Sequence, residues 1–437
     1  MQSCVRVVRV VRQLFVCLLI VLFAAPLAFA EPIPFRRAIE LALQHSGVMA
    51  VAAVDRVRAY GLYNEARRSY APAVVFGSGL GYSFGVPLTI AGSAPSLFNL
   101  NTQQYVVNFA QRDLVRAARI EWQASNLDIE DKRAAVILDT ALLYTELDSL
   151  TEKLRVLREQ LQAGQRAEFI SIERRKEGID SELDVKRAQL TTARAQLRLA
   201  EAEGNADVLR ERLGKLVGIP AASLETVTDS VPRTPNVDQS DDLSLRAVQS
   251  SVAAKYADQK AQAADFRARS ESRQLLPSVD FATQYALLST YNNYDEFYRK
   301  FSRNNFSFGA SIRFPLFNPA QRAHAEAAKA DAIKAKRQAE DVRDQVANDT
   351  LKLQRSVKQL AAAREVARLE YELAQGNLDA TQAKVQGGTA TARDVESARA
   401  DASDRHSAYL DATFELYRVQ MQLMRATGDL QDWALGR

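Results

Sequence analysis

Apolar and small residues recur at alternating spacings of four and three along two long stretches of the chain. The first stretch carries them at Val136, Thr140, Leu143, Leu147, Leu150, Leu154, Leu157 and Leu161. The same pattern returns 210 residues later at Val346, Thr350, Leu353, Val357, Leu360, Arg364, Ala367 and Tyr371, with Arg364 as its polar exception. A sustained period of 3.5 residues keeps one face of a helix against its neighbours. The pattern therefore predicts long packed helices in two repeats.

Each stretch is followed by a glycine and a second helical pattern. Gly178 precedes Leu183-Asp184-Val185, and Gly388 precedes Arg393-Asp394-Val395. Both patterns then run to a terminal glycine, Gly218 or Gly428, and Arg405 interrupts the second. We expect one helical hairpin per repeat, with arms of about 40 to 50 residues, or roughly 60 to 75 Å. A single chain cannot cover both faces of such a hairpin, so neighbouring subunits are implied.

The period changes to two after Pro72 and after Pro277, where a proline ends a helix and begins an extended run. The alternation predicts strands at about 74–86, 102–110, 278–288 and 304–314. Large apolar residues on one face and glycine or polar residues on the other suit a barrel with lipid outside and water inside. A soluble amphipathic sheet packed on a helix is the alternative interpretation. Because an open sheet edge is not tolerated in lipid, four strands demand oligomerisation.

The first 30 residues read as a cleaved signal peptide, with Arg6, Arg9 and Arg12 ahead of an apolar stretch of twelve residues that ends at Pro26. An uncleaved anchor is the alternative, although so short a stretch is poorly suited to spanning a bilayer. Both cysteines of the chain, Cys4 and Cys17, lie in this segment. The mature protein would then hold no disulfide and no thiolate metal site.

Chemistry-bearing patterns are sparse elsewhere in the sequence. Loss of the leader lowers the formal net charge from +4 to about +1, which disfavours nucleic acid as a partner. His45, His324 and His406 share no ligand spacing. No catalytic serine, zinc or phosphate-loop motif occurs. We therefore expect no enzymatic activity, no cofactor and no metal centre.

These landmarks together resemble the TolC family of outer-membrane efflux proteins. The family's glycine-threonine turn and aspartate-valine pair occur here as Gly388-Thr389 and Asp394-Val395, and its terminal alanine-threonine-glycine occurs as 426–428. The resemblance covers about Pro34 to Trp433. It implies a mainly α protein with membrane β structure. In it, long helical hairpins form a trimeric α-barrel continuous with a twelve-stranded β-barrel, four strands per subunit.

The resemblance also implies a division of the chain and a set of partners. A first repeat over 31–218 and a second over 243–428 are joined by an equatorial linker over 219–242, and 429–437 form a tail. The homotrimer would sit in outer-membrane lipid and extend into the periplasm. There its tip would dock onto a periplasmic adaptor, coupled to an inner-membrane pump of the RND, ABC or MFS type. Gly178, Gly387, Gly388 and Thr389 match the turns that adaptors grip.

Acidic residues near the turns are candidates for a periplasmic gate. Asp394 matches the first of two acidic rings in the best-known family member, whereas the second falls on Ser397, beside Glu396. Val385 and Ala390 replace polar gate-holding residues, and Asp184 is the repeat equivalent of Asp394. Three aspartates around an axis would raise one another's pKa. A carboxylate that only stabilises a helix start is the alternative role for Asp394 and Asp184.

The sequence thus predicts a passive exit duct of a tripartite efflux or type I secretion system. A periplasmic or surface coiled-coil scaffold that conducts nothing is the alternative from another class. It would explain the heptads and leave the four strands unexplained. A cell-wall enzyme lacks any supporting residues. The exported substrate is not encoded in these patterns, because specificity lies largely in the pump.

Overall fold

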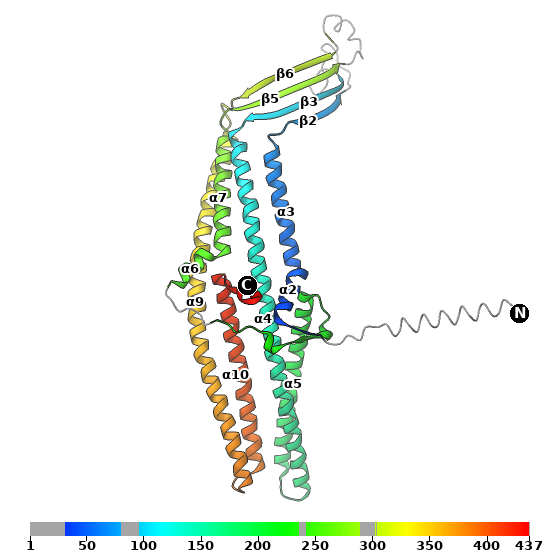
Figure 1. Ribbon diagram of the computed structural model, residues 1–437, viewed down its shortest axis with the longest axis vertical. Coiled ribbons are helices and arrows are strands. Elements are labelled where there is room, and N and C mark those ends of the chain that lie inside the picture. The colour runs from blue at the N-terminus through cyan, green and yellow to red at the C-terminus, as the bar shows by residue number, and fades with distance from the viewer. Residues whose placement is uncertain (1–30, 80–95, 236–241, 289–301, 303, 437) are drawn as a thin grey trace, which may run out of the picture. The chain divides into compact units, whose positions relative to one another are not determined.

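The computed structural model describes residues 31–79, 96–235, 242–288, 302 and 304–436 (Figure 1). The signal peptide predicted over 1–30 lies outside the described residues. The chain forms two compact units. Unit 1 contains residues up to His45, Asp139–Thr234 and Leu360–Arg418, and unit 2 contains Ser46–Leu138, Pro235–Gln359 and Val419–Arg437. Helices α4 (Phe109–Lys176), α9 (Pro319–Gln386) and α10 (Ala392–Thr427) contribute to both.

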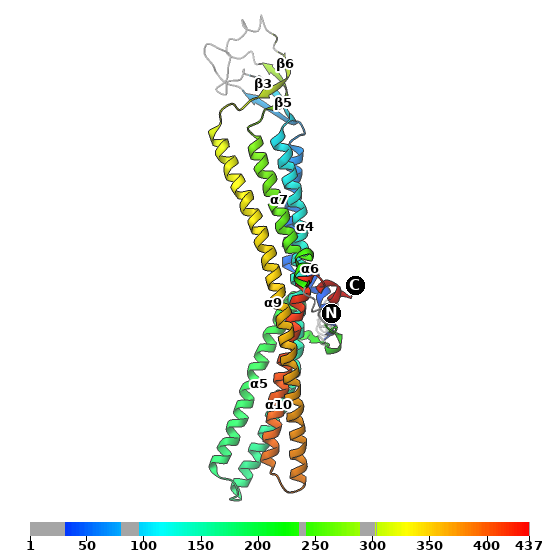
Figure 2. The same cartoon turned by 90° about the vertical axis from the view of Figure 1, so that its left-hand side faces the viewer.

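Unit 1 holds two helical hairpins. The end of α4 turns into α5 (Glu182–Val217), and the end of α9 turns into α10 (Figure 2). The predicted face of α4 is buried at Val136, Thr140, Leu143, Leu147, Leu154 and Leu157. In α9 the equivalent positions are buried at Thr350 and Val357 and half-buried at the other six. Long helices therefore form where the 3.5-residue period predicts them.

The two arginines that break the apolar pattern of the second repeat have partners on the opposite arm. The Arg364 guanidinium lies 5.8 Å from the centre of the Tyr409 ring and donates a hydrogen bond of 3.3 Å to the Tyr409 hydroxyl. Arg405 pairs with Glu370 at 2.8 Å. The guanidinium groups thus hold α9 and α10 together where apolar contacts are missing.

A small parallel sheet, which the sequence patterns do not reveal, completes unit 1. Strand β1 (Glu31–Ile33) pairs with β4 (Leu224–Thr226), between η1 (Ala221–Ser223) and η2 (Thr228–Ser230). The helix α2 (Phe35–His45) follows β1. Residues that share full burial form the core here, namely Phe35, Ile39, Tyr144, Leu213 and Val217.

Unit 2 carries a four-stranded antiparallel sheet in the order β2-β3-β5-β6 (Figure 1). The strands are β2 (Ala73–Gly79), β3 (Ser96–Val107), β5 (Ser278–Leu288) and β6 (Asn304–Arg313). Pro72 and Pro277 directly precede β2 and β5. Large rings on one face are exposed, including Phe76 at 70% and Phe308 at 72%.

The second predicted strand needs a correction. The alternation predicts it over 102–110, but β3 begins at Ser96 and ends at Val107, and α4 begins at Phe109. The Asn108 side chain accepts a hydrogen bond of 2.9 Å from the Gln111 N–H, so Asn108 caps the helix. An asparagine in an alternating run looks like a polar strand position, and its capping role appears only with the helix in place. Residues 80–86 of the first predicted strand lie outside the described residues.

The remaining helices of unit 2 are α3 (Gly47–Arg68), α6 (Leu243–Ser250), α7 (Val252–Arg273) and α11 (Leu430–Leu435). Side-chain bonds tie the ends of α3 and α7 to the start of α4. Gln111 donates to the Ala66 carbonyl at 2.7 Å, and Ser270 donates to the Ala110 carbonyl at 2.8 Å. Within the described residues, no helix has the length and apolarity needed to cross a membrane.

Candidate functional site at the hairpin turns

The two hairpin turns share one backbone design. Gly178 and Gly388 adopt φ values of 76° and 75°, a left-handed conformation that favours glycine. The N–H of the next residue, Ile179 or Thr389, bonds to the carbonyl five positions back, at 2.9 and 2.8 Å respectively. This pattern terminates α4 and α9 in the same way. The turn positions singled out in the sequence thus end both helices, and neighbouring Gly387 needs no left-handed backbone.

The candidate gate aspartates cap the helices that follow these turns. Asp184 accepts hydrogen bonds from the Ser181 N–H at 3.1 Å and the Ser181 hydroxyl at 2.7 Å. Asp394 accepts from the Thr391 N–H and hydroxyl, both at 2.8 Å. Each is the third residue of a capping box, in which two orphan backbone donors are satisfied reciprocally. The helix-start role considered for both residues is therefore present in the single chain.

Their local bonds also set the charge of these carboxylates. The pKa of Asp394 is lowered chiefly by the backbone and side chain of Thr391. The pKa of Asp184 is lowered chiefly by the hydroxyl and backbone of Ser181, with a further contribution from Arg393. Both groups are therefore ionised near neutral pH. Mutual repulsion between aspartates of several subunits around one axis would raise their pKa. That effect would oppose the lowering by the local hydrogen bonds.

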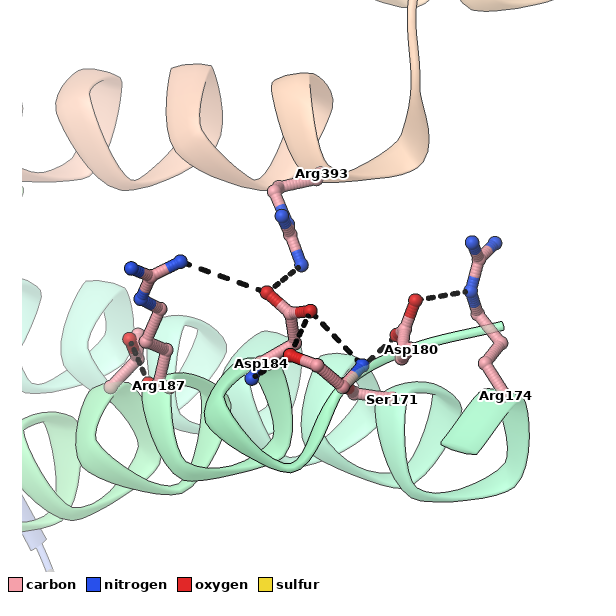
Figure 3. Close-up of polar contacts among 8 residues, drawn as sticks. Ser171, Arg174, Asp180, Asp184, Arg187 and Arg393 are labelled. Carbon is pink, nitrogen blue, oxygen red and sulfur yellow. Dashed lines mark hydrogen bonds and ion pairs between the residues drawn. The ribbon is translucent and has the colours of Figure 1, made fainter. Parts of the chain in front are cut away.

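A cross-hairpin ion pair joins α5 to α10 at these helix starts (Figure 3). The Arg393 guanidinium donates to the Asp184 carboxylate at 3.1 Å, whereas Arg187 of α5 itself lies 3.7 Å from the same carboxylate. The repeat equivalent of Arg393 is Leu183, so no reciprocal pair exists. Sequence reasoning missed Arg393. The replacement of leucine by arginine within otherwise similar repeats is the signal that could have found it.

The first turn is further fastened by Asp180. It accepts a hydrogen bond from the Ser171 hydroxyl at 3.0 Å and pairs with Arg174 at 3.1 Å (Figure 3). Its repeat equivalent is Ala390, which has no carboxylate, so the second turn lacks these two side-chain interactions. The second turn instead has the Thr389 hydroxyl, which donates to the Lys384 carbonyl at 3.1 Å.

Glu396 and Asp394 have different hydrogen-bond and ion-pair partners. Glu396 pairs with Arg399 at 2.8 Å along α10 and lines a half-open cavity of about 470 Å³ between the two hairpins of unit 1. His406 and Tyr371 line the same cavity, with their rings stacked 4.5 Å apart. The structure thus brings Asp184 to Arg393 and does not join the three predicted acidic residues in one cluster. In the described residues no group of side chains could hold a metal ion.

The family model described as "Outer membrane efflux protein" matches residues 38–219 and 244–429. The chain belongs to the outer membrane efflux protein family. It is therefore an efflux channel of the outer membrane that extends into the periplasm. Family membership also implies a trimeric assembly that works with an adaptor and an inner-membrane pump.

Solved channels of this kind share the fold at low sequence identity. The outer membrane protein VceC from Vibrio cholerae is 20% identical with a TM-score of 0.73, over 90% of this chain and 96% of that one. The CmeC outer membrane channel of Campylobacter jejuni is 15% identical with a TM-score of 0.75, over 91% and 86%. The open state of the MtrE channel of Neisseria gonorrhoeae is 17% identical with a TM-score of 0.68, over 92% and 90%. No curated protein matches this efflux protein as a sequence relative.

Proposed function

We propose that three copies of this efflux protein form a passive duct that is closed at the hairpin turns and opened by an adaptor. An inner-membrane pump of the RND, ABC or MFS type supplies the energy. The Arg393–Asp184 pair carries this proposal, because it is the contact that ties the second hairpin to the first beside both turns. Its loss frees the two hairpins to separate at their tips. The exposed turns at Gly178 and Gly387-Gly388-Thr389 are the surfaces offered to the adaptor.

The sheet of unit 2 supports closure by several copies. Strands β2 and β6 stand at its two ends, and each has one neighbour within the described chain. In lipid such edges must be paired, and three four-stranded sheets supply twelve strands in one barrel. The exposed phenylalanines Phe76, Phe306 and Phe308 suit a lipid-facing surface. A non-conducting scaffold that does not enter lipid would leave these exposed phenylalanines unexplained.

The decisive experiment is single-channel recording of the purified mature protein in a planar lipid bilayer, with its oligomer size measured in parallel. We expect discrete openings from a trimer and a higher open probability for Arg393→Ala. Arg187→Ala is the matched control, since Arg187 contacts the same carboxylate from the same hairpin. Equal effects of the two changes would remove the cross-hairpin pair from the gate. A monomer that never conducts would favour the scaffold.

The acidic constriction is tested in the same recordings. Asp394→Ala should weaken block of the current by multivalent cations, because three carboxylates around a narrow axis bind cations. Glu396→Ala should have a smaller effect, since Glu396 is already paired with Arg399. Unchanged block in Asp394→Ala would leave that residue with its capping role alone.

A further inference from the structure

The cavity between the two hairpins of unit 1 has the size and the lining of a small-molecule site. Its volume of about 470 Å³ lies within the range of ligand pockets, which is roughly 300 to 1,000 Å³. All four long helices of the unit line it, α4 and α5 from the first hairpin and α9 and α10 from the second. Buried apolar side chains form part of its wall, namely Val156, Ala163, Ala195, Leu378 and Ala402. A molecule in this inter-hairpin cavity would therefore contact both hairpins at once.

The charged groups that line the cavity do not balance. Four arginines and three carboxylates line it, and burial lowers the pKa of His406, which keeps its ring neutral near neutral pH. Each carboxylate is paired with one of the arginines, in Arg155–Glu159 at 2.6 Å, Arg198–Asp404 at 2.8 Å and Arg399–Glu396 at 2.8 Å. Arg194 of α5 forms no ion pair or hydrogen bond with any described residue. The lining thus carries one positive charge that the described part of the chain does not neutralise.

Two uncharged polar groups in the same wall also lack partners. The Ser403 hydroxyl and the Gln160 side-chain oxygen are shielded from solvent, and neither bonds to a described residue. Thr191, by contrast, donates its hydroxyl to the Arg187 carbonyl one turn earlier at 3.1 Å. Leaving a shielded polar group without a partner is costly. The serine can donate, and the glutamine amide can present its N–H groups after a half-turn, so an oxygen acceptor in the cavity would satisfy both.

A pair of stacked rings supplies a flat apolar surface in the same cavity. The rings of Tyr371 on α9 and His406 on α10 lie 4.5 Å apart, with an angle of 15° between their planes, and both residues line the cavity. Aromatic rings pack well against such a surface. Because only one positive charge is left without a partner, a monoanion suits the wall better than a dianion. The wall therefore combines donors for one anionic group with a surface for a ring.

We propose that the inter-hairpin cavity binds a small monoanionic aromatic carboxylate, which Arg194 holds and against which the Tyr371 and His406 rings pack. A guanidinium and a carboxylate fit each other through two parallel hydrogen bonds. Ser403 and Gln160 supply further donors. Arg194 belongs to the first hairpin and the two rings belong to the second, so the bound molecule bridges them. In the duct of the proposed function, on which this last consequence rests, binding should hold the hairpins together and lower the open probability.

Calorimetric titration with cinnamate tests the site on the purified mature protein in lipid nanodiscs, which avoid competition from detergent. We expect one saturable site per chain, with a Kd on the order of 0.1 mM for a ligand of this size. Cinnamamide has the same ring and chain without the charge, and it should bind about tenfold more weakly. Empty nanodiscs measure how much of each compound enters the lipid.

Substitutions assign the binding to Arg194. Arg194→Gln should weaken cinnamate binding about tenfold, because a charge-assisted pair of hydrogen bonds is lost. Arg194→Lys keeps the charge without the forked geometry and should restore part of the affinity. Lys186→Gln is the matched control, since Lys186 is exposed on α5 and does not line the cavity, and it should leave binding unchanged. Ala400→Leu narrows the cavity from α10 without changing a charge and should also reduce binding.

The outcomes distinguish the site from the proposed function. If the folded protein binds no cinnamate saturably, the site is overturned and the duct still stands. Equal affinity for cinnamate and cinnamamide, or unchanged affinity in Arg194→Gln, overturns the assignment of an anion to this arginine. Open probability is then recorded in a planar bilayer with and without cinnamate. Unchanged openings despite binding overturn the bridging of the hairpins, whereas a protein that binds cinnamate but never conducts overturns the proposed function and supports the site.

Discussion

The Tyr144 hydroxyl fastens the small sheet of unit 1 to α4, so its removal should loosen that sheet. The hydroxyl donates to the Ile33 carbonyl at 2.7 Å and accepts from the Val227 N–H at 2.7 Å. Tyr144→Phe keeps the ring, which makes an edge contact with Phe35 at 5.4 Å, and deletes only the hydroxyl. The substitution thus isolates the polar contribution of one atom.

The expected cost follows from these two partners. An unsatisfied buried polar group costs about 1 to 3 kcal/mol. The neighbouring Ser230 hydroxyl already donates to the Val227 carbonyl and accepts from the Phe35 N–H. We therefore expect about 2 to 3 kcal/mol of local destabilisation, or roughly 30- to 160-fold faster amide exchange. The rate of amide hydrogen exchange over residues 224–230, measured by mass spectrometry, reports this local destabilisation directly.

A matched control removes a tyrosine hydroxyl that has no such partners. The Tyr63 ring stacks on Trp122 at 5.8 Å, and its hydroxyl makes no hydrogen bond to the described residues. Tyr63→Phe should leave exchange over 224–230 unchanged. An acceleration below about threefold in Tyr144→Phe would refute the argument, because no buried donor would then have been left unpaired.

Three further predictions concern the turns and two titrating groups. Gly388→Ala should destabilise its turn by about 1 kcal/mol, because Gly388 has a positive φ. We expect roughly fivefold faster proteolysis at that turn. Gly387→Ala should leave proteolysis unchanged, because Gly387 does not have a positive φ. Burial raises the pKa of Asp148, so its folded form retains the proton more readily. The stability it contributes is present at low pH and lost as pH rises through that pKa, and Asp148→Asn should flatten this slope in acid unfolding curves. Burial instead lowers the pKa of His406, so its contribution is present above pH 6.5 and lost as pH falls through the lowered pKa. His406→Phe should keep the stack on Tyr371 and abolish this acid sensitivity, as measured by exchange of 371–378.

Local periodicity was enough to predict the two helical hairpins, their turns and the approximate positions of the four strands of the sheet in unit 2. The 3.5-residue and two-residue periods arise from residues close together in the sequence, and they place the apolar side chains of each helix or strand on one face. Gly178 and Gly388 stand out because a left-handed turn admits few other residues. The family resemblance rests on the order of these local features, and the family match agrees with it.

Tertiary structure alone decided the contacts between segments far apart in the sequence. Strand β1 pairs with β4 across almost 200 residues. Strands of three residues are too short for a two-residue alternation to reveal them in the sequence. Arg393 meets Asp184 only because two hairpins lie side by side, and Asn108 acts as a cap only because a helix follows it. A sequence pattern reports which face of an element is buried. Which polar group meets which depends on packing that brings distant residues together.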